Sequence, residues 1–205
     1  MRGVEGVPLL YDAMMAFAEA TGFREWRVRL VSGARGRVLD VGCGTGRSLR
    51  LYGGGVTAVG LDPRLQLLDA ARRRSPETPL VAASAEALPF RDGVFDTVVS
   101  GLVFCSVPDP LLGLSEVDRV LRPDGTLRML EHVRSVRPLM ARWQDLIQPT
   151  WTWISGGCHP NRDTEATVES SGFVIDRGQL QARRNVRLFT ATRPARGGPP
   201  VEPLG

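Results

Sequence analysis

The residues with the clearest chemical potential are an acid and three glycines. Asp40 lies near the end of an apolar run that begins at Val38, and Gly42, Gly44 and Gly46 follow at alternate positions. Because glycines lack Cβ atoms and accept positive φ, they let the backbone lie against a ligand. Such a turn also points free N–H groups, and the start of the next helix, at the ligand's polar end. The pattern predicts a turn that binds a nucleoside cofactor, although a glycine-rich loop without a ligand is the plainer alternative.

A second acid, Asp62, follows the next apolar run, about 20 residues after Gly42. A carboxylate at this place can accept both hydroxyls of a ribose. It could also cap the helix that we expect to begin at Pro63, and the two roles are compatible. Dinucleotide-binding oxidoreductases have an acid at the same distance from their first glycine, so the spacing of Asp62 does not distinguish them from other nucleoside-binding proteins. In their glycine pattern, however, the third glycine comes one residue later, and nothing in that pattern corresponds to Asp40.

The composition indicates one globular domain without a nucleic-acid partner. The chain has 205 residues and a net charge of +4 that is spread along the sequence. Its densest basic run, Arg72–Arg74, is more typical of a solvated helix face than of a patch for nucleic acid or anionic membranes. Three scattered cysteines and no cleavable signal favour a reducing cytoplasm. The most apolar N-terminal segment, 7–20, is too short to cross a bilayer.

Apolar runs of strand length alternate with helical patterns, which predicts an α/β fold. We expect a Rossmann-like, seven-stranded, mostly parallel sheet with an antiparallel last strand and helices on both faces. The expected strands lie near 36–41, 56–61, 79–82, 95–100, 126–131, 173–178 and 186–193. We expect helices near 8–20 and 23–33, a third that begins after Pro63, a fourth that ends near Leu121, and a fifth at 163–171. Because 179–186 is too short for a parallel crossover, the last two strands should form a hairpin. We expect one domain over 1–194 and a disordered tail over 195–205.

Over about 36–131 the chain resembles the class I S-adenosylmethionine-dependent methyltransferases. The resemblance lies in the acid and glycine turn, the second acid and a polar pair after the third expected strand. In that family these groups bind the amino acid portion, the ribose and the adenine edge of the cofactor. The resemblance implies S-adenosyl-L-methionine as cofactor and implies cofactor contacts for Asp40, Gly42, Gly44, Gly46, Asp62, Ala85 and Glu86. We expect Cys43, Pro63 and Leu102 to line the same site. The family often has Asp where this chain has Ser84.

A second resemblance covers the later part of the chain. The segments 102–107, 131–133, 143–144, 149–151 and 157–158 are similar to the alkyl thiol S-methyltransferases of the methyltransferase-like group. This resemblance implies a small thiol as methyl acceptor. Membrane-anchored members of that group begin with a long apolar helix that this sequence lacks. We therefore expect no integral membrane segment here.

The segment 132–162 is the expected cap and acceptor wall of the site. It contains three of the four tryptophans and both histidines, and aromatic walls with few polar groups suit an apolar or cationic small molecule. The tryptophans could instead pack this segment onto the sheet. We assign Tyr11, Cys105, Trp143, Trp151 and His159 to acceptor binding, although Tyr11 could equally be a packing residue, Cys105 an ordinary buried thiol and His159 a loop histidine.

His132 is the candidate catalytic base, because it follows the carboxyl end of the fifth expected strand, next to the methyl donor. It could alternatively cap backbone groups in the loop. Cys158 and His159 are adjacent and chelate poorly, and no partner pair has zinc spacing, so we expect no metal site.

Methyl transfer from a sulfonium is an in-line displacement that needs alignment and exclusion of water. A thiol acceptor requires little acid–base machinery, because its pKa is near ~8.5. A phospholipid amine or a quinone-like ring are alternative acceptors. From other classes, a nicotinamide-dependent oxidoreductase is disfavoured by the early third glycine and the terminal hairpin, whereas a non-catalytic cofactor-binding protein stays open. The sequence does not indicate the oligomeric state.

Overall fold

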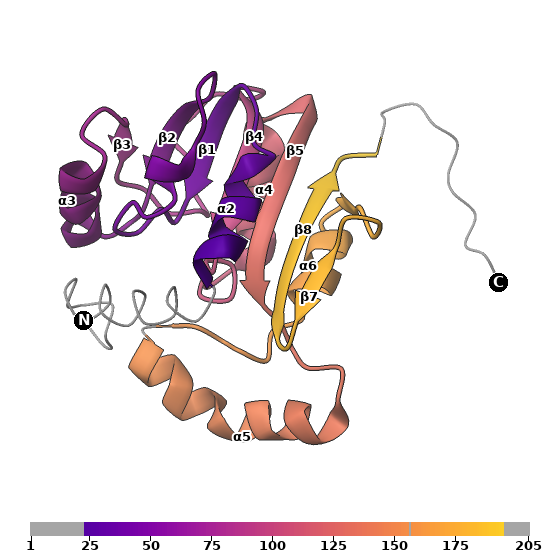
Figure 1. The fold of residues 1–205 in the computed structure, drawn as a ribbon. Coiled ribbons are helices and arrows are strands. Elements are labelled where there is room, and N and C mark those ends of the chain that lie inside the picture. The colour runs from indigo at the N-terminus through magenta and orange to yellow at the C-terminus, as the bar shows by residue number, and fades with distance from the viewer. Residues whose placement is uncertain (1–22, 156, 195–205) are drawn as a thin grey trace.

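The computed structural model describes residues 23–155 and 157–194, which form one twisted sheet with helices around it (Figure 1). The strands are β1 (Arg37–Val41), β2 (Thr57–Leu61), β3 (Leu80–Val81), β4 (Phe95–Gly101), β5 (Leu121–His132), β6 (Val174–Ile175), β7 (Gln181–Arg183) and β8 (Val186–Thr192). Their order is β3-β2-β1-β4-β5-β8-β6, with β7 paired to β8. β1 to β5 pair in parallel and β8 is antiparallel to β5. The predicted mostly parallel sheet is therefore confirmed.

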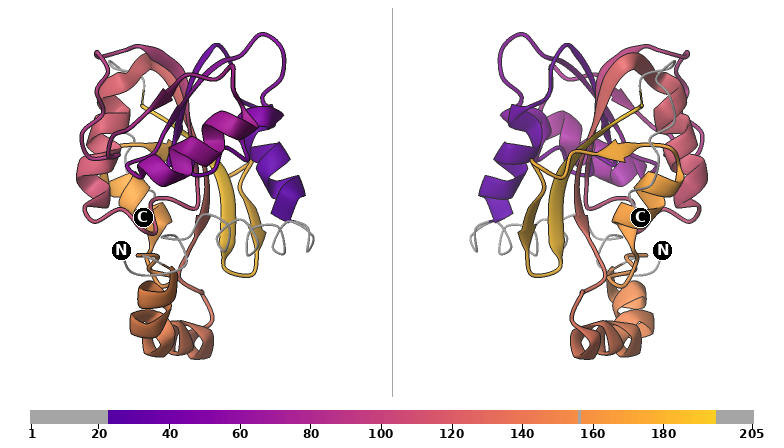
Figure 2. Two further views of the ribbon diagram at one scale, coloured as in Figure 1. Left: turned by 90° about the vertical axis from the view of Figure 1, so that its left-hand side faces the viewer. Right: turned by 90° about the vertical axis from the view of Figure 1, so that its right-hand side faces the viewer.

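Helices cover both faces of this sheet, and one further helix, α5 (Pro138–Ser155), lies apart from it (Figure 2). The helices are α2 (Arg24–Ser32), the short 3-10 helix η3 (Leu49–Leu51), α3 (Leu65–Arg74), α4 (Pro110–Val120), α5 and α6 (Thr164–Ser170). Successive residues of β1 point to opposite faces, as a strand requires. Val38 is in the apolar cluster with Leu30 of α2, whereas Leu39 is in the cluster with Leu114 of α4 and Val168 of α6.

Three details differ from the sequence prediction. The helix expected at Pro63 begins at Leu65, and Arg64 rather than Asp62 is its N-cap residue. Asp62 instead accepts the N–H of Arg64 at 2.9 Å, which forms a turn before the helix. The fifth strand begins at Leu121, earlier than expected, with a register irregularity opposite β4. The sheet has eight strands rather than seven, because β7 forms the tight hairpin with β8 within the segment expected to be a loop.

The predicted helix at 23–33 corresponds to α2, whereas the predicted helix at 8–20, with Tyr11, and the predicted tail at 195–205 lie outside the described residues. Among the residues that the structure describes, no helix combines the length and the apolar character needed to cross a membrane.

Glu131, near the end of β5, is a fully buried carboxylate that binds the loop after β4. Its Oε1 accepts the N–H groups of Val103 and Phe104, both at 3.0 Å, and the hydroxyl of Ser100 at 3.1 Å. Its Oε2 accepts the N–H of Cys105 at 3.3 Å. Burial raises the pKa of this carboxyl, and the bonds from Val103, Phe104, Ser100 and Cys105 oppose that shift.

The loop after β4 begins with a residue in the left-handed backbone conformation, which few residues other than glycine adopt. Leu102 has φ +62, and its N–H donates to the carbonyl of Leu130 at 2.7 Å. A non-glycine residue in the left-handed region is maintained by its surroundings. The contacts of Glu131 with the next three residues provide that constraint.

We predict that Glu131→Gln lowers the free energy of unfolding by about 1.5–3 kcal/mol, because an amide group keeps one acceptor oxygen and turns the other into a donor facing N–H groups. Chemical denaturation followed by circular dichroism measures this change. The exposed Glu77→Gln is the matched control and should stay within about 0.5 kcal/mol of the wild type. A Glu131→Gln variant as stable as this control would contradict the role of Glu131.

Candidate functional site

The glycine turn after β1 has the backbone conformation that the sequence predicted. Gly42, Gly44 and Gly46 have φ of +66, +55 and +77. A Cβ at Gly42 would lie 2.4 Å from Cγ2 of Val103, and one at Gly46 would lie 3.0 Å from backbone and side-chain atoms of Ala71. Gly42 and Gly46 are thus required by the close approach of the loop after β4 and of α3, in addition to any ligand.

Asp40 is a buried acid at the mouth of this turn, with 2% of its surface exposed. Its Oδ2 accepts the hydroxyl of Tyr52 at 3.0 Å. Burial raises the pKa of Asp40 to about 7, while the Tyr52 bond and the charge of Arg27 act in the opposite direction. Sequence reasoning missed both Tyr52 and Arg27, since neither is near Asp40 in the chain.

Asp62 joins the glycine turn after β1 to the turn that follows β2. Its fully buried carboxylate accepts the N–H of Gly44 at 3.1 Å through Oδ2 and the N–H of Arg64 at 2.9 Å through Oδ1. The guanidinium of Arg64 also lies on this carboxylate, with Nε 3.2 Å from Oδ1. Asp62 therefore fixes the glycine turn relative to the end of β2.

A cleft runs along the carboxyl ends of β1, β2, β3 and β4. Five of the predicted cofactor residues line it: Gly42, Asp62, Pro63, Ala85 and Leu102. Asp40 and Cys43 line an adjoining recess that shares Gly42 and Gly101 with the cleft. The sequence did not identify other lining residues, among them Arg64, Ser84, Val103 and Ser106.

Three predicted cofactor residues contribute mainly to the shape of this cleft. Gly44 and Gly46 form the turn without lining the cleft. Glu86 accepts the hydroxyl of Ser84 at 2.8 Å and the N–H of Asp109 at 2.7 Å. Its carboxylate therefore ties the loop after β3 to the start of α4.

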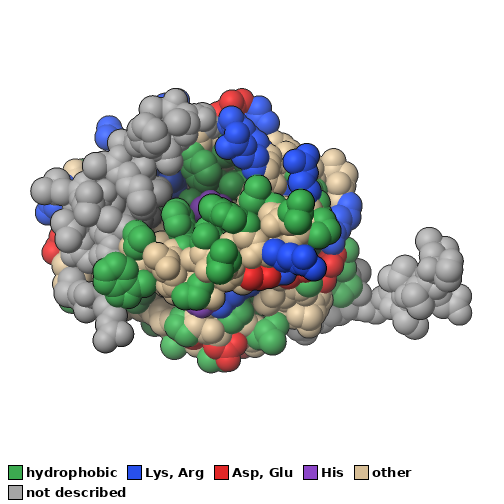
Figure 3. Space-filling view, turned by 90° about the horizontal axis from the view of Figure 1, so that it is seen from below, with side chains coloured by type: hydrophobic (Ala, Val, Ile, Leu, Met, Phe, Trp, Pro, Cys, Tyr) green, Lys and Arg blue, Asp and Glu red, His purple; other side chains and the backbone are tan. Residues whose placement is uncertain are grey.

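The predicted cap is dominated by α5, which lies apart from the sheet beyond the carboxyl ends of its strands (Figure 1). Viewed from below, this face gathers hydrophobic side chains, with a histidine visible between them (Figure 3). Trp143, Trp151 and Trp153 are 55%, 40% and 65% exposed. The tryptophans therefore do not serve mainly to pack this segment onto the sheet.

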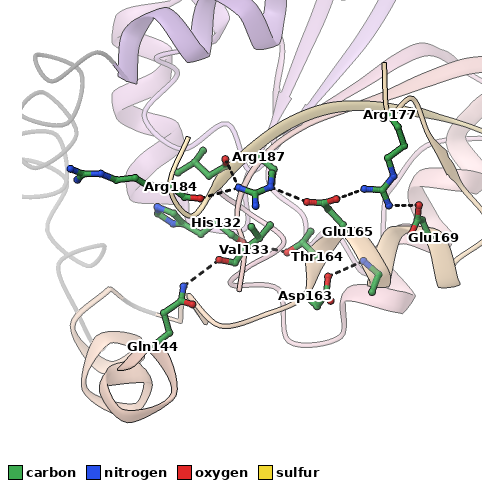
Figure 4. A network of polar contacts seen from close by, with 12 residues as sticks. His132, Val133, Gln144, Asp163, Thr164, Glu165, Glu169, Arg177, Arg184 and Arg187 are labelled. Atoms are coloured by element: carbon green, nitrogen blue, oxygen red, sulfur yellow. Dashed lines mark hydrogen bonds and ion pairs between the residues drawn. The ribbon is translucent and has the colours of Figure 1, made fainter. Parts of the chain in front are cut away.

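Gln144 is one of the side chains that attach α5 to the rest of the protein, and it is the most buried of them. It is 3% exposed, and its Nε2 donates to the carbonyl of Val133 at 3.2 Å (Figure 4). The same Nε2 donates to the carbonyl of Pro160 at 2.8 Å, and Oε1 accepts the N–H of Ser135 at 2.7 Å. The amide of Gln144 thus joins the segment before α5 to the segment after it. Sequence reasoning quoted Gln144 only as part of a motif.

The chain after α5 returns to the loop that follows β4. The N–H of His159 donates to the carbonyl of Cys105 at 2.8 Å. The guanidinium of Arg162 donates to the carbonyls of Phe104 and Val107 at 2.5 and 2.8 Å. These bonds bring Cys158 against the end of β5.

Two cysteines and a histidine meet there. Nδ1 of His132 lies 4.0 Å from Sγ of Cys158, and these two atoms and Sγ of Cys105 all lie within 4.8 Å of one another. Sγ of Cys105 is also 3.7 Å from Oγ of Ser106, which lines the cleft. The cluster therefore adjoins the cleft at the carboxyl ends of the strands.

The two thiols of the cluster have opposite pKa shifts. A hydrogen bond from the Cys105 thiol lowers the pKa of Cys158, and contacts with His132 and Trp151 act in the same direction. The same bond and burial raise the pKa of Cys105. His132 and Cys105 were predicted site residues, whereas Cys158 was not.

The backbone of His132 is fixed by β8 and α6 (Figure 4). His132 pairs with Val186 across the sheet, and its carbonyl accepts the hydroxyl of Thr164 at 3.5 Å. An ion-pair chain from Arg187 through Glu165 to Arg177 joins β8, α6 and the chain beyond it. In Figure 4 the His132 ring projects away from these ion pairs.

Comparisons with known proteins agree with this geometry. Residues 39–149 match a family described as methyltransferase domain. The chain is 36% identical over 157 residues to human thiol S-methyltransferase TMT1B, which covers 72% of this chain and 64% of that protein. It is 41% identical over 114 residues to demethylmenaquinone methyltransferase of Renibacterium salmoninarum, covering 53% and 48%. The chain thus spans less than two thirds of the length of either relative.

Among solved structures, the YcgJ protein of Bacillus subtilis superposes with a TM-score of 0.67 at 16% identity, covering 83% of this chain and 98% of that chain. This likeness supports the Rossmann-like fold. The family match covers the strands and loops that carry the glycine turn, both buried acids and the cleft between them. The chain belongs to the methyltransferase domain family, and S-adenosyl-L-methionine is its cofactor.

Proposed function

We propose that the protein transfers the methyl group of S-adenosyl-L-methionine to the sulfur of a small, apolar thiol. The observation that carries the proposal is the cluster beside the cleft, where the imidazole of His132 and the thiols of Cys105 and Cys158 lie within 4.8 Å of one another. The match to human thiol S-methyltransferase TMT1B also supports it. That match covers 157 residues and therefore extends beyond residues 39–149, which match the general methyltransferase domain family.

The residues of the cleft fit the cofactor. The buried carboxylate of Asp40 suits its ammonium group, and the absence of a side chain at Gly42 leaves the backbone open at the turn. Asp62 can accept ribose hydroxyls if the side chain of Arg64, which is 36% exposed, moves aside. The guanidinium can turn to solvent, and the ribose hydroxyls would then donate to the buried carboxylate in its place. The bound cofactor supplies an electrophilic methyl carbon on a sulfonium.

A thiol matches the groups available at the acceptor end. A free thiol has a pKa near ~8.5, so a few per cent is already thiolate at neutral pH. His132, next to the end of β5, needs only to favour that ionised form. A phenolic or quinol oxygen, with a pKa near ~10, would require a stronger base.

The α5 side of the site suits the apolar part of such an acceptor. Trp151 contacts the thiol of Cys158 and is 40% exposed, so it has surface available for a ligand. Apolar and aromatic walls with few polar groups are typical of small-molecule sites. We infer that Trp151, rather than the more exposed Trp143, contacts the acceptor.

Cofactor affinity should depend on pH through Asp40. Its pKa of about 7 means that the carboxylate, the form that attracts the cofactor's ammonium, gains population as the pH rises. We expect the dissociation constant of S-adenosyl-L-methionine to fall several-fold between about pH 5.5 and about pH 7.5 in calorimetry. Asp40→Asn should bind more weakly and without this pH dependence. A wild type with constant affinity over the same interval would contradict this role.

A panel of acceptors tests the proposed reaction. The protein is incubated with S-adenosyl-L-methionine and an alkyl thiol, an aryl thiol, a reduced naphthoquinone or phosphatidylethanolamine, and methylated products are measured by mass spectrometry. We expect thioethers from both thiols at rates at least about tenfold above those of the other products, because only the thiols ionise readily. Faster methylation of the naphthoquinol ring would overturn the proposal and favour the quinone-type reaction named for the bacterial relative.

The contribution of His132 should depend on the acidity of the acceptor. His132→Asn should lower turnover by roughly 10²-fold for an alkyl thiol, whose ionised form is scarce. For an acidic aryl thiol, which is already ionised, the loss should be much smaller. Steady-state rates on both thiols provide the comparison, and the aryl thiol serves as the internal control for folding and cofactor binding. Equal losses on both would exclude a role in favouring the thiolate.

A further inference from the structure

We propose that Cys105, His132 and Cys158 form a Zn²⁺ site beside the cofactor cleft, with a fourth position open to the acceptor's sulfur. The role of the fourth position depends on the proposed thiol methylation, whereas the metal site itself does not. The sequence alone predicted no metal site, because its three ligands come from separate segments and not from a short motif.

The distances between the three ligand atoms are close to those of a tetrahedral zinc site. With Zn–S near ~2.3 Å and Zn–N near ~2.0 Å, tetrahedral angles place two sulfurs about 3.8 Å apart and sulfur and nitrogen about 3.5 Å apart. Sγ of Cys158 and Nδ1 of His132 are 4.0 Å apart, and all three pairs are within 4.8 Å. Small side-chain rotations would therefore complete the geometry.

Each ligand is positioned by contacts of its own. The backbone of Cys105 is fixed by Glu131 at its N–H and by His159 at its carbonyl. The N–H and carbonyl of Cys158 bond to the hydroxyls of Ser155 and Thr152 at 3.2 and 2.9 Å. Such support from surrounding groups is what orients ligands in known metal sites.

His132, the third ligand, is held by the pairing of β5 with β8 and presents Nδ1 to Cys158. Two cysteines and one histidine are a ligand set of catalytic zinc sites, which keep one coordination position for water or substrate. The charge also suits the location. Two thiolates neutralise a divalent ion, so the loaded site adds no net charge next to the buried carboxylate of Glu131.

The position of the cluster beside the cleft would allow the acceptor's sulfur to occupy the fourth coordination position. Cys105 and Cys158 are 1% and 7% exposed, which keeps the thiolates away from bulk solvent, and Cys105 adjoins Ser106 in the wall of the cleft. An acceptor thiol that occupies the fourth position loses its proton to solvent and binds as thiolate. A lone pair of that sulfur then forms the bond to the methyl carbon, while the bond from this carbon to the sulfonium sulfur breaks and leaves its electron pair there. The thioether dissociates from the zinc, and no oxidant or reductant is consumed.

Metal content provides the first test. The full chain, purified under reducing conditions without chelators and equilibrated with Zn²⁺, should retain about one zinc per chain by mass spectrometry of the element. Cys105→Ser and Cys158→Ser should each lower zinc affinity at least about tenfold. Cys43→Ser, a buried cysteine outside the cluster, is the matched control and should retain zinc. A wild type without zinc, a disulfide between Cys105 and Cys158 under these conditions, or equal loss in the control would overturn the proposal.

Cobalt substitution tests the geometry and the fourth position in the wild type, so the result does not depend on whether variants fold. Co²⁺ should give the intense visible bands of tetrahedral coordination and a thiolate charge-transfer band in the near ultraviolet. Benzyl mercaptan should strengthen and shift these bands, and toluene should not. An octahedral spectrum would overturn the site, and an unchanged spectrum with benzyl mercaptan would overturn the acceptor role.

Activity separates this proposal from the proposed function. Metal-free protein that methylates thiols as fast as zinc-loaded protein would overturn the catalytic role of the metal and leave thiol methylation intact. Zinc-loaded protein that methylates no thiol would overturn the proposed function, while the spectra would still support a metal site.

Discussion

The geometry of the site depends on one buried carboxylate. Glu131 accepts three successive N–H groups and one hydroxyl, and these bonds hold the loop after β4 against the end of β5. An ionised group without solvent is tolerated in an interior only when its oxygens are satisfied in this way. The loop that it fixes supplies Val103, which packs on Gly42, and Cys105, which meets His132 and Cys158. The glycine turn and the cluster of Cys105, His132 and Cys158 are therefore both positioned by the same interaction.

Much of the fold follows from local patterns in the sequence. Alternating strand-length and helical patterns predicted the sheet with helices on both faces, and the short segment 179–186 predicted its antiparallel end. β7 was missed because all three of its residues are exposed, so it has no apolar alternation to reveal a strand. The start of α3 was misplaced because the carboxylate of Asp62 bonds to the N–H of Arg64 and delays the helix. Both errors come from contacts that periodicity does not encode.

The site divides in the same way. The glycine turn and Asp62 are short-range features, and the sequence identified them. The partners of Asp40, namely Tyr52 and Arg27, lie on other elements, so nothing in the motif pointed to them. Glu86 matches a family motif, but its carboxylate binds Ser84 and Asp109. Cys158 approaches His132 because long-range bonds, among them those of Gln144 and Arg162, return the chain from α5 to the sheet.

The charges around the cleft explain why this arrangement suits a cationic cofactor. Asp40, Asp62 and Glu131 are 2%, 0% and 0% exposed, and all three lie at the carboxyl ends of parallel strands. Burial raises the pKa of Asp40 and of Glu131, because their charged forms lose hydration there. A ligand that brings an ammonium and a sulfonium supplies the missing positive charge at this edge, and binding to the folded state alone increases stability. The buried acids at this edge of the sheet therefore contribute to affinity for a cationic ligand.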